Sequence, residues 1–125
     1  MPSLLIVDDE IDVCEFARNF FRKRQIDVFV ATGGRQALDL IEEMKFELIL
    51  LDVRMGEMNG IEVLEELRTK NIMVKVIMVS GVVDIEVINE AKRLGVINFI
   101  NKPFILEELE EMVLTHLKSQ KEVGL

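Results

Sequence analysis

Acidic side chains follow two apolar runs of the sequence, at the point where each run stops. Asp8 and Asp9 come directly after residues 4–7, and Asp52 comes directly after residues 48–51. Four consecutive aliphatic residues are typical of a strand that is buried on both faces of a parallel sheet. Open α/β sheets bind their ligands at the carboxyl ends of such strands. If the two strands are neighbours, the three carboxylates share a pocket and repel one another, which favours a hard divalent cation, Mg²⁺.

Two further polar groups, Ser80 and Lys102, each follow a later apolar segment. Together with the acids they form a set that suits phosphoryl transfer, which depends mostly on positioning and charge stabilisation. We expect Asp52 to be the nucleophile that becomes an aspartyl phosphate. Mg²⁺ held by Asp9, Asp52 and Asp8 would neutralise charge on the transferring oxygens. Lys102 and Ser80 would each contact one phosphoryl oxygen.

The elements that must position these groups alternate along the chain. Apolar runs predict strands at 3–7, 26–31, 47–51, 74–79 and 96–100, and helical periodicity predicts helices at 10–24, 33–44, 61–70, 84–94 and 106–118. Thr32 is expected to cap the second helix. Such alternation predicts βαβ units, hence an α/β fold with five parallel strands and helices on both faces. We expect one domain over residues 1–118, and a frayed tail or the start of a linker over 119–125.

Composition limits the classes of function. The 125 residues carry a formal net charge of −8, which argues against direct nucleic-acid binding. The apolar stretches are of strand length, too short to span a membrane. The single cysteine, Cys14, excludes an internal disulfide and fits a reducing compartment, so we expect a cytoplasmic protein. His116 is the only histidine and falls in the last predicted helix, so a phosphohistidine donor would belong to another protein.

The ordered set of motifs resembles the receiver domain of a two-component response regulator, over about residues 3–117. The matching segments are IVDDE at 6–10, LDVRM at 51–55 with NG at 59–60, VSG at 79–81, and NKPF at 101–104. The resemblance implies a doubly wound, flavodoxin-like sheet with strand order 2-1-3-4-5. It implies that Asp8 and Asp9 hold Mg²⁺, that Asp52 takes phosphate from a kinase histidine, and that Ser80 and Lys102 bind the phosphoryl group.

The same resemblance implies several finer features. The backbone carbonyl of Arg54 would be a further metal ligand, and Phe99 would be an aromatic switch residue coupled to Ser80. The Lys102–Pro103 peptide bond is expected to be cis. The protein would be a signalling switch that promotes its own phosphorylation and dephosphorylation. Its partners would be a sensor histidine kinase or a phosphotransfer protein, and an unidentified output domain, docking partner or second copy in a phosphorylation-dependent homodimer. The surface of the fourth helix, fifth strand and fifth helix would carry the signal.

Three positions depart from the family pattern. Gly56 stands where the family usually carries proline, which predicts a looser loop after Asp52. Arg54 and Val82 are expected to flank the path of a hydrolytic water without orienting it, which predicts a long-lived aspartyl phosphate.

Three other classes of protein remain as alternatives. A phosphatase of the haloacid dehalogenase type needs a second aspartate two residues after the nucleophile, where this chain has Arg54. A flavodoxin-like flavin protein needs a hydroxyl- and glycine-rich loop after the first strand, where this chain has Asp8 and Asp9. The third is a receiver-like docking module that no longer takes phosphate. All five polar residues of the site are present in this chain, which argues against it.

Overall fold

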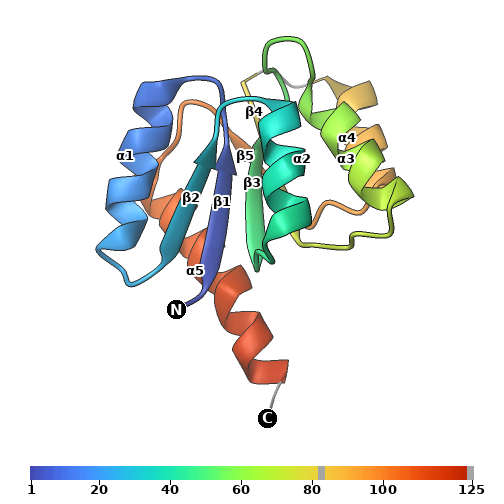
Figure 1. Ribbon diagram of the computed structural model, residues 1–125. Helices are drawn as coiled ribbons and strands as arrows, with labels where there is room; N and C mark the ends of the chain where they lie inside the picture. The colour runs from blue at the N-terminus through green and yellow to red at the C-terminus, as the bar shows by residue number, and fades with distance from the viewer. Residues whose placement is uncertain (82–83, 124–125) are drawn as a thin grey trace.

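The computed structural model describes residues 1–81 and 84–123 of the chain. Its strands are β1 (Ser3–Val7), β2 (Asp27–Ala31), β3 (Leu48–Asp52), β4 (Val76–Ser80) and β5 (Asn98–Asn101). Its helices are α1 (Ile11–Arg22), α2 (Gly34–Glu43), α3 (Gly60–Thr69), α4 (Ile85–Arg93) and α5 (Leu106–Val123). The strands form one parallel sheet in the order β2-β1-β3-β4-β5 (Figure 1). The predicted doubly wound α/β fold and its strand order are confirmed.

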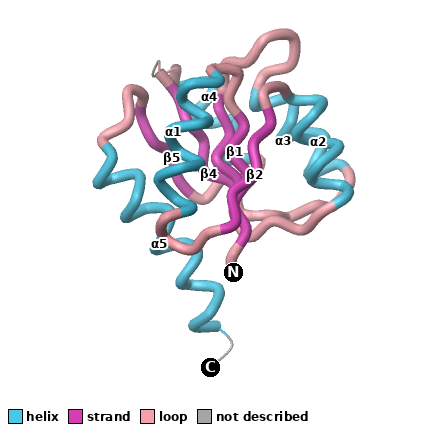
Figure 2. The backbone as a smooth tube through the Cα atoms, turned by 60° about the vertical axis from the view of Figure 1, so that its left-hand side comes forward, coloured by secondary structure: helices cyan, strands magenta, loops and turns pink. Residues whose placement is uncertain are grey.

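Helices cover both faces of this sheet (Figures 1 and 2). One hydrophobic cluster lies beneath α2, α3 and α4, and a second lies beneath α1 and α5. In β1, Leu4 and Ile6 belong to the α1/α5 cluster, whereas Leu5 and Val7 belong to the other. Side chains alternate between the two faces of a strand. A strand covered on both faces therefore requires the uninterrupted aliphatic run that the sequence provides.

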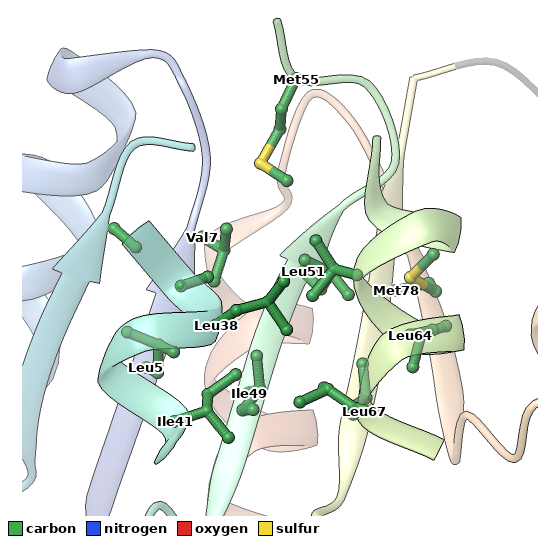
Figure 3. Packing of buried hydrophobic residues seen from close by; sticks show 14 of the residues in the cluster. Leu5, Val7, Leu38, Ile41, Ile49, Leu51, Met55, Leu64, Leu67 and Met78 are labelled. Carbon is green, nitrogen blue, oxygen red and sulfur yellow. The ribbon is translucent and has the colours of Figure 1, made fainter. Parts of the chain in front are cut away.

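The cluster beneath α2 and α3 also anchors the loop that follows β3. Figure 3 shows Leu38 of α2 and Leu64 of α3 beside Leu51 of β3, each of them at most 1% exposed. Met55 follows β3 and is 3% exposed in the same cluster. The chain after Asp52 is thus tied to the core at Met55, although Gly56 next to it is exposed and has a φ of 37°.

The helix starts follow local capping chemistry, with one correction. Asn59 caps α3 in a capping box with Glu62, and the Asp84 side chain caps α4. The prediction that Thr32 caps α2 is wrong, because Gly33 is the N-cap residue. The Thr32 N–H instead donates to Gln36 Oε1 at 2.8 Å, which holds the end of β2 against the first turn of the helix.

Two helices differ from their predicted extents. Helix α5 continues to Val123, past the predicted end at residue 118, and its last turns project beyond the sheet (Figures 1 and 2). Helix α1 ends at Arg22, short of its predicted end at residue 24. Phe16 has the helical spacing of an apolar-face residue, but it is 58% exposed and stacks on Phe20. Within residues 1–81 and 84–123, no helix combines the length and the apolar character needed to cross a bilayer.

Candidate functional site

The candidate site lies at the carboxyl ends of β1, β3 and β5, on the side of the sheet that α1 and α5 cover. Strand alternation places it there, because Asp8 follows Leu4 and Ile6 in the α1/α5 cluster and Asp52 follows Leu48 and Leu50 in the same way. The register pairs the last residue of β1 with the residue before Asp52. Asp8 and Asp52 are therefore brought side by side, and they are only 3% and 5% exposed.

Asp9 completes an acidic cluster with these two side chains. One carboxylate oxygen each from Asp8, Asp9 and Asp52 lie within 4.8 Å of one another, with Asp9 exposed and the other two buried. Three carboxylates at this spacing repel one another, and a carboxylate set is the ligand type that hard divalent cations prefer. The predicted convergence of the three acids is confirmed.

Lys102 enters this cluster from the loop after β5. Its Nζ lies 2.8 Å from Asp8 Oδ2 and 2.9 Å from Asp52 Oδ2. It also lies 3.3 Å from Glu10 Oε1. Burial by itself lowers the pKa of Lys102, but the hydrogen bonds to Asp8 and Asp52 outweigh it and raise that pKa above its ordinary value. The side chain is therefore a permanent cation among the acids.

The surroundings of Asp52 destabilise its ionised form. Burial raises the pKa of Asp52 above its ordinary value, and the charge on Asp8 raises it further, against the hydrogen bond from Lys102. The Arg54 N–H donates to Asp52 Oδ1 at 3.3 Å. A single ammonium thus leaves the acid cluster short of positive charge, so a second cation would relieve it.

Close backbone contacts fix the strand end that carries Asp52. The Gly60 N–H donates to the Val53 carbonyl at 2.8 Å, and the Val53 N–H donates to the Val79 carbonyl at 2.9 Å. A Cβ placed on Gly60 would lie only 2.4 Å from the Asp52 carbonyl oxygen. The start of α3 can therefore sit against the end of β3 only because residue 60 is glycine.

The loop that carries Asp8 is held from α1. Cys14 Sγ donates to the Asp8 carbonyl at 3.1 Å, and the Glu10 N–H donates to Asp8 Oδ1 at 2.9 Å. Burial, and then the charge on Asp8, raise the pKa of the Cys14 thiol to about 11. The thiol is therefore protonated at neutral pH and acts as a donor.

Ser80 and Phe99 lie on the opposite face of the sheet. Phe99 is paired with Met78 in the β4–β5 register, and Ser80 is paired with Asn101, so Ser80 and Phe99 are diagonal neighbours on one face. Phe99 is half-buried and packs against the cluster beneath α3 and α4. The Lys102 N–H donates to the Ser80 carbonyl at 2.9 Å, which ties the two strand ends together.

Some sequence predictions about the site are confirmed, and one falls outside the described residues. The Lys102–Pro103 bond is cis, as expected. Asp8, Asp9, Asp52 and Lys102 come together, whereas Val82 lies outside the residues that the structure describes. Sequence reasoning missed the contact of Glu10 with Lys102. Its only signal was a long acidic side chain directly after the acid pair, where short capping residues are common.

Comparisons with known proteins agree with this geometry. A family model described as the response regulator receiver domain matches residues 4–114. Sporulation initiation phosphotransferase F of Bacillus subtilis (strain 168) is 32% identical over 115 residues, which cover 92% of this chain and 93% of that protein. The solved CheY-like response regulator receiver domain protein from Methanospirillum hungatei JF-1 has a TM-score of 0.92 at 27% identity, covering 99% of both chains.

Of two further matches, one was solved with a bound ligand and the other is a much longer protein. The Thermotoga maritima response regulator protein TrrA, solved in complex with Mg²⁺ and BeF, has a TM-score of 0.81 at 26% identity over 94% of this chain and 100% of that one. The transcriptional regulatory protein ZraR of Escherichia coli (strain K12) is 34% identical over 94% of this chain. The chain spans only about a quarter of the length of such regulators. With the family match over most of its length and the acid cluster at the expected sheet edge, the chain belongs to the response regulator receiver domain family of two-component signalling.

Proposed function

We propose that this receiver domain takes a phosphoryl group onto Asp52. The observation that carries the proposal is the surroundings of that carboxylate, which is buried beside Asp8 and Asp9 and lies 2.9 Å from the Lys102 ammonium. A nucleophilic carboxylate needs nearby cations to balance the charge that the phosphoryl group brings. The alternative of a receiver-like docking module without phosphate would leave this strained arrangement without a use.

The acid cluster fits a divalent cation, by the chemistry of its donors. Asp8, Asp9 and Asp52 would hold Mg²⁺, and the Arg54 backbone carbonyl is the further ligand that the family resemblance implies. Burial and then the charge on Asp8 raise the pKa of Asp52, and a bound cation would offset both effects. The related protein TrrA, which is 26% identical, was solved in complex with Mg²⁺ and BeF, which supports a divalent cation in this family. When bound, Mg²⁺ would supply charge neutralisation for the phosphoryl oxygens.

In the proposed transfer, an Asp52 carboxylate oxygen attacks the phosphorus of a partner's phosphohistidine. The new O–P bond forms as the P–N bond breaks, and the nitrogen keeps the electron pair of the broken bond. Lys102 moves from the Asp52 carboxylate to a phosphoryl oxygen, so its charge follows the charge that is transferred. Hydrolysis of the acyl phosphate by water returns free Asp52. The domain would thus promote both its own phosphorylation and its own dephosphorylation.

The partners proposed for this chemistry are a sensor histidine kinase or a phosphotransfer protein, in the cytoplasm. Phosphate on Asp52 would attract the Ser80 hydroxyl, because phosphoryl oxygens are strong acceptors. Ser80 and Phe99 share a face of the sheet, so movement of Ser80 would let the Phe99 ring repack beneath α4. The surface of α4, β5 and α5 would then change its affinity for an output domain, a docking partner or a second copy.

A labelling experiment tests the phosphoacceptor. The protein is incubated with acetyl phosphate and Mg²⁺, and the modified residue is mapped by mass spectrometry. We expect phosphate on Asp52, loss of labelling on removal of Mg²⁺, and no labelling of Asp52→Asn. Labelling of another residue, or undiminished labelling of the variant, would refute the assignment, and an unlabelled wild type would favour the docking module.

A beryllofluoride experiment tests the switch. Two structures, with and without beryllofluoride and Mg²⁺, should differ at Ser80 and Phe99, and Ser80→Ala should keep phosphorylation while losing the change in partner affinity. If Ser80 and Phe99 stay in place while partner affinity still changes, the signal leaves by another route.

A further inference from the structure

Glu10 is an unusual residue type for the N-cap of a helix. It is the N-cap residue of α1, where short side chains are preferred because they can accept from the first turn. Its carboxylate makes no such bond with the described residues of α1. The Oε1 atom instead lies 3.3 Å from Lys102 Nζ, a residue 92 positions further along the chain. The longer side chain thus reaches across the site rather than capping its own helix.

Lys102 is held by three carboxylates at different depths. Its own side chain is 18% exposed, and those of Asp8 and Asp52 are 4% and 7% exposed. The side chain of Glu10 is 63% exposed, so it forms the outer rim of the cluster. An incoming phosphodonor therefore meets the charge of Glu10 before it reaches Lys102.

We propose that Glu10 is a positioning residue that retains Lys102 among the carboxylates and slows phosphoryl transfer from small anionic donors. The proposal rests on the proposed function, in which Lys102 must turn to a phosphoryl oxygen. Glu10 competes with that oxygen for the ammonium, and its charge repels the donor at the rim. The same negative charge strengthens the binding of a divalent cation at the neighbouring acids. Removal of Glu10 should therefore raise the rate of transfer and weaken cation binding.

The size of the effect follows from the exposure of Glu10. A solvent-exposed ion pair changes an equilibrium or rate constant by at most about fivefold. We expect Glu10→Gln to raise the rate of labelling by acetyl phosphate about threefold at saturating Mg²⁺, and to raise the Kd for Mg²⁺ by a similar factor. Because a rim charge acts mostly on encounter, the gain in rate should shrink as salt is added.

The experiment compares Glu10→Gln with a matched control, Glu15→Gln. Glu15 lies in α1, which Glu10 precedes, and it is exposed and pairs with Arg18. Both substitutions remove one negative charge, so they change the net charge of the protein equally. Labelling rates are measured at low and high salt, and the Kd for Mg²⁺ is measured by calorimetry with the metal alone. Opposite changes in rate and cation affinity in Glu10→Gln, with neither in Glu15→Gln, support the proposal, because a loss of structure would lower both.

A second variant separates the contact from the charge. Glu10→Asp keeps the charge but has a side chain one methylene shorter, so it should lose the contact with Lys102. Its rate of labelling by acetyl phosphate should therefore lie between those of the wild type and Glu10→Gln. A Glu10→Asp variant identical to wild type would overturn the contact, and equal rates in wild type and Glu10→Gln would overturn the whole proposal. An unlabelled wild type would instead refute the proposed function, so the two failures are distinguishable.

Discussion

Gly60→Ala should disturb the backbone that positions Asp52. The added Cβ would lie 2.4 Å from the Asp52 carbonyl oxygen and 3.1 Å from Val53 Cα. Both obstacles are backbone atoms, and hydrogen bonds at 2.8 and 2.9 Å hold them on either side. The start of α3 must therefore move away from β3, and the movement must include the residue that carries the phosphoacceptor.

The magnitude follows from the nature of the obstacle. Overpacking costs typically about 1–3 kcal/mol, and an obstacle made of backbone belongs at the upper end, about 3 kcal/mol. For a chain of this size the unfolding entropy is about 0.26 kcal/mol per kelvin, so the melting temperature should fall by about 11 °C. The displacement of Asp52 should also slow labelling by acetyl phosphate, by about tenfold or more.

Two other glycines provide graded controls. A Cβ on Gly34 would lie 2.9 Å from Met58 and from a methyl group of Val63, which are side-chain atoms that can give way. Gly34→Ala should therefore cost less, about 1–2 kcal/mol. A Cβ on Gly33 would have no heavy atom of the described residues within 4 Å, so Gly33→Ala should change the free energy of unfolding least.

Urea unfolding and the labelling rate are the assays for the three variants. If Gly60→Ala unfolds and labels like Gly33→Ala, the close approach of α3 to the end of β3 does not constrain the site, and the steric reasoning is wrong.

Three further predictions concern charge, the loops and the thiol. Burial raises the pKa of Asp52, so without a divalent cation its contribution to the free energy of unfolding should fall as the pH rises above the pKa of an ordinary aspartate, about 3.9. Asp52→Asn should escape this loss, and a stability difference that does not grow between pH 4 and pH 7 would contradict it. Arg68 donates to three backbone carbonyls in the loops before β4 and β5, so Arg68→Met should lower the free energy of unfolding by about 2 kcal/mol, whereas Arg93→Met, at an exposed pair, should change it little in urea unfolding. Because burial and Asp8 raise the pKa of Cys14 to about 11, alkylation at pH 8 should be about 100-fold slower in the folded protein than in urea; rates within tenfold of each other would show an accessible thiolate.

The sequence alone determined the order of the elements and the place of the acids. Buried strands and amphipathic helices have different periods, so alternation along the chain was enough to predict five βα units and the parallel sheet they form. The abrupt end of each aliphatic run marked Asp8 and Asp52 as residues at strand ends. Parallel strands share a carboxyl edge, so their convergence with Lys102 followed from the fold class.

Local patterns were less informative at the ends of elements. Thr32 has the chemistry of a cap, yet Gly33 is the N-cap residue, and the Thr32 hydroxyl donates to Gln36 Oε1 rather than accepting from the first turn. Phe16 has the spacing of an inward residue on α1, but the width of the covered face leaves it exposed beside Phe20. Periodicity gives the direction of a helix face, and only packing decides where that face stops.

The tertiary structure alone decided the contacts that tune the site. Glu10 reaches Lys102, Cys14 holds the Asp8 carbonyl, and Gly60 lies against the Asp52 carbonyl. Each contact joins atoms whose separation depends on strand register, crossover geometry and side-chain rotamer together. Periodicity along a sequence records which face a residue occupies, but it carries no information about distances of a few ångströms between separate elements, because these are set only when all the elements pack at once.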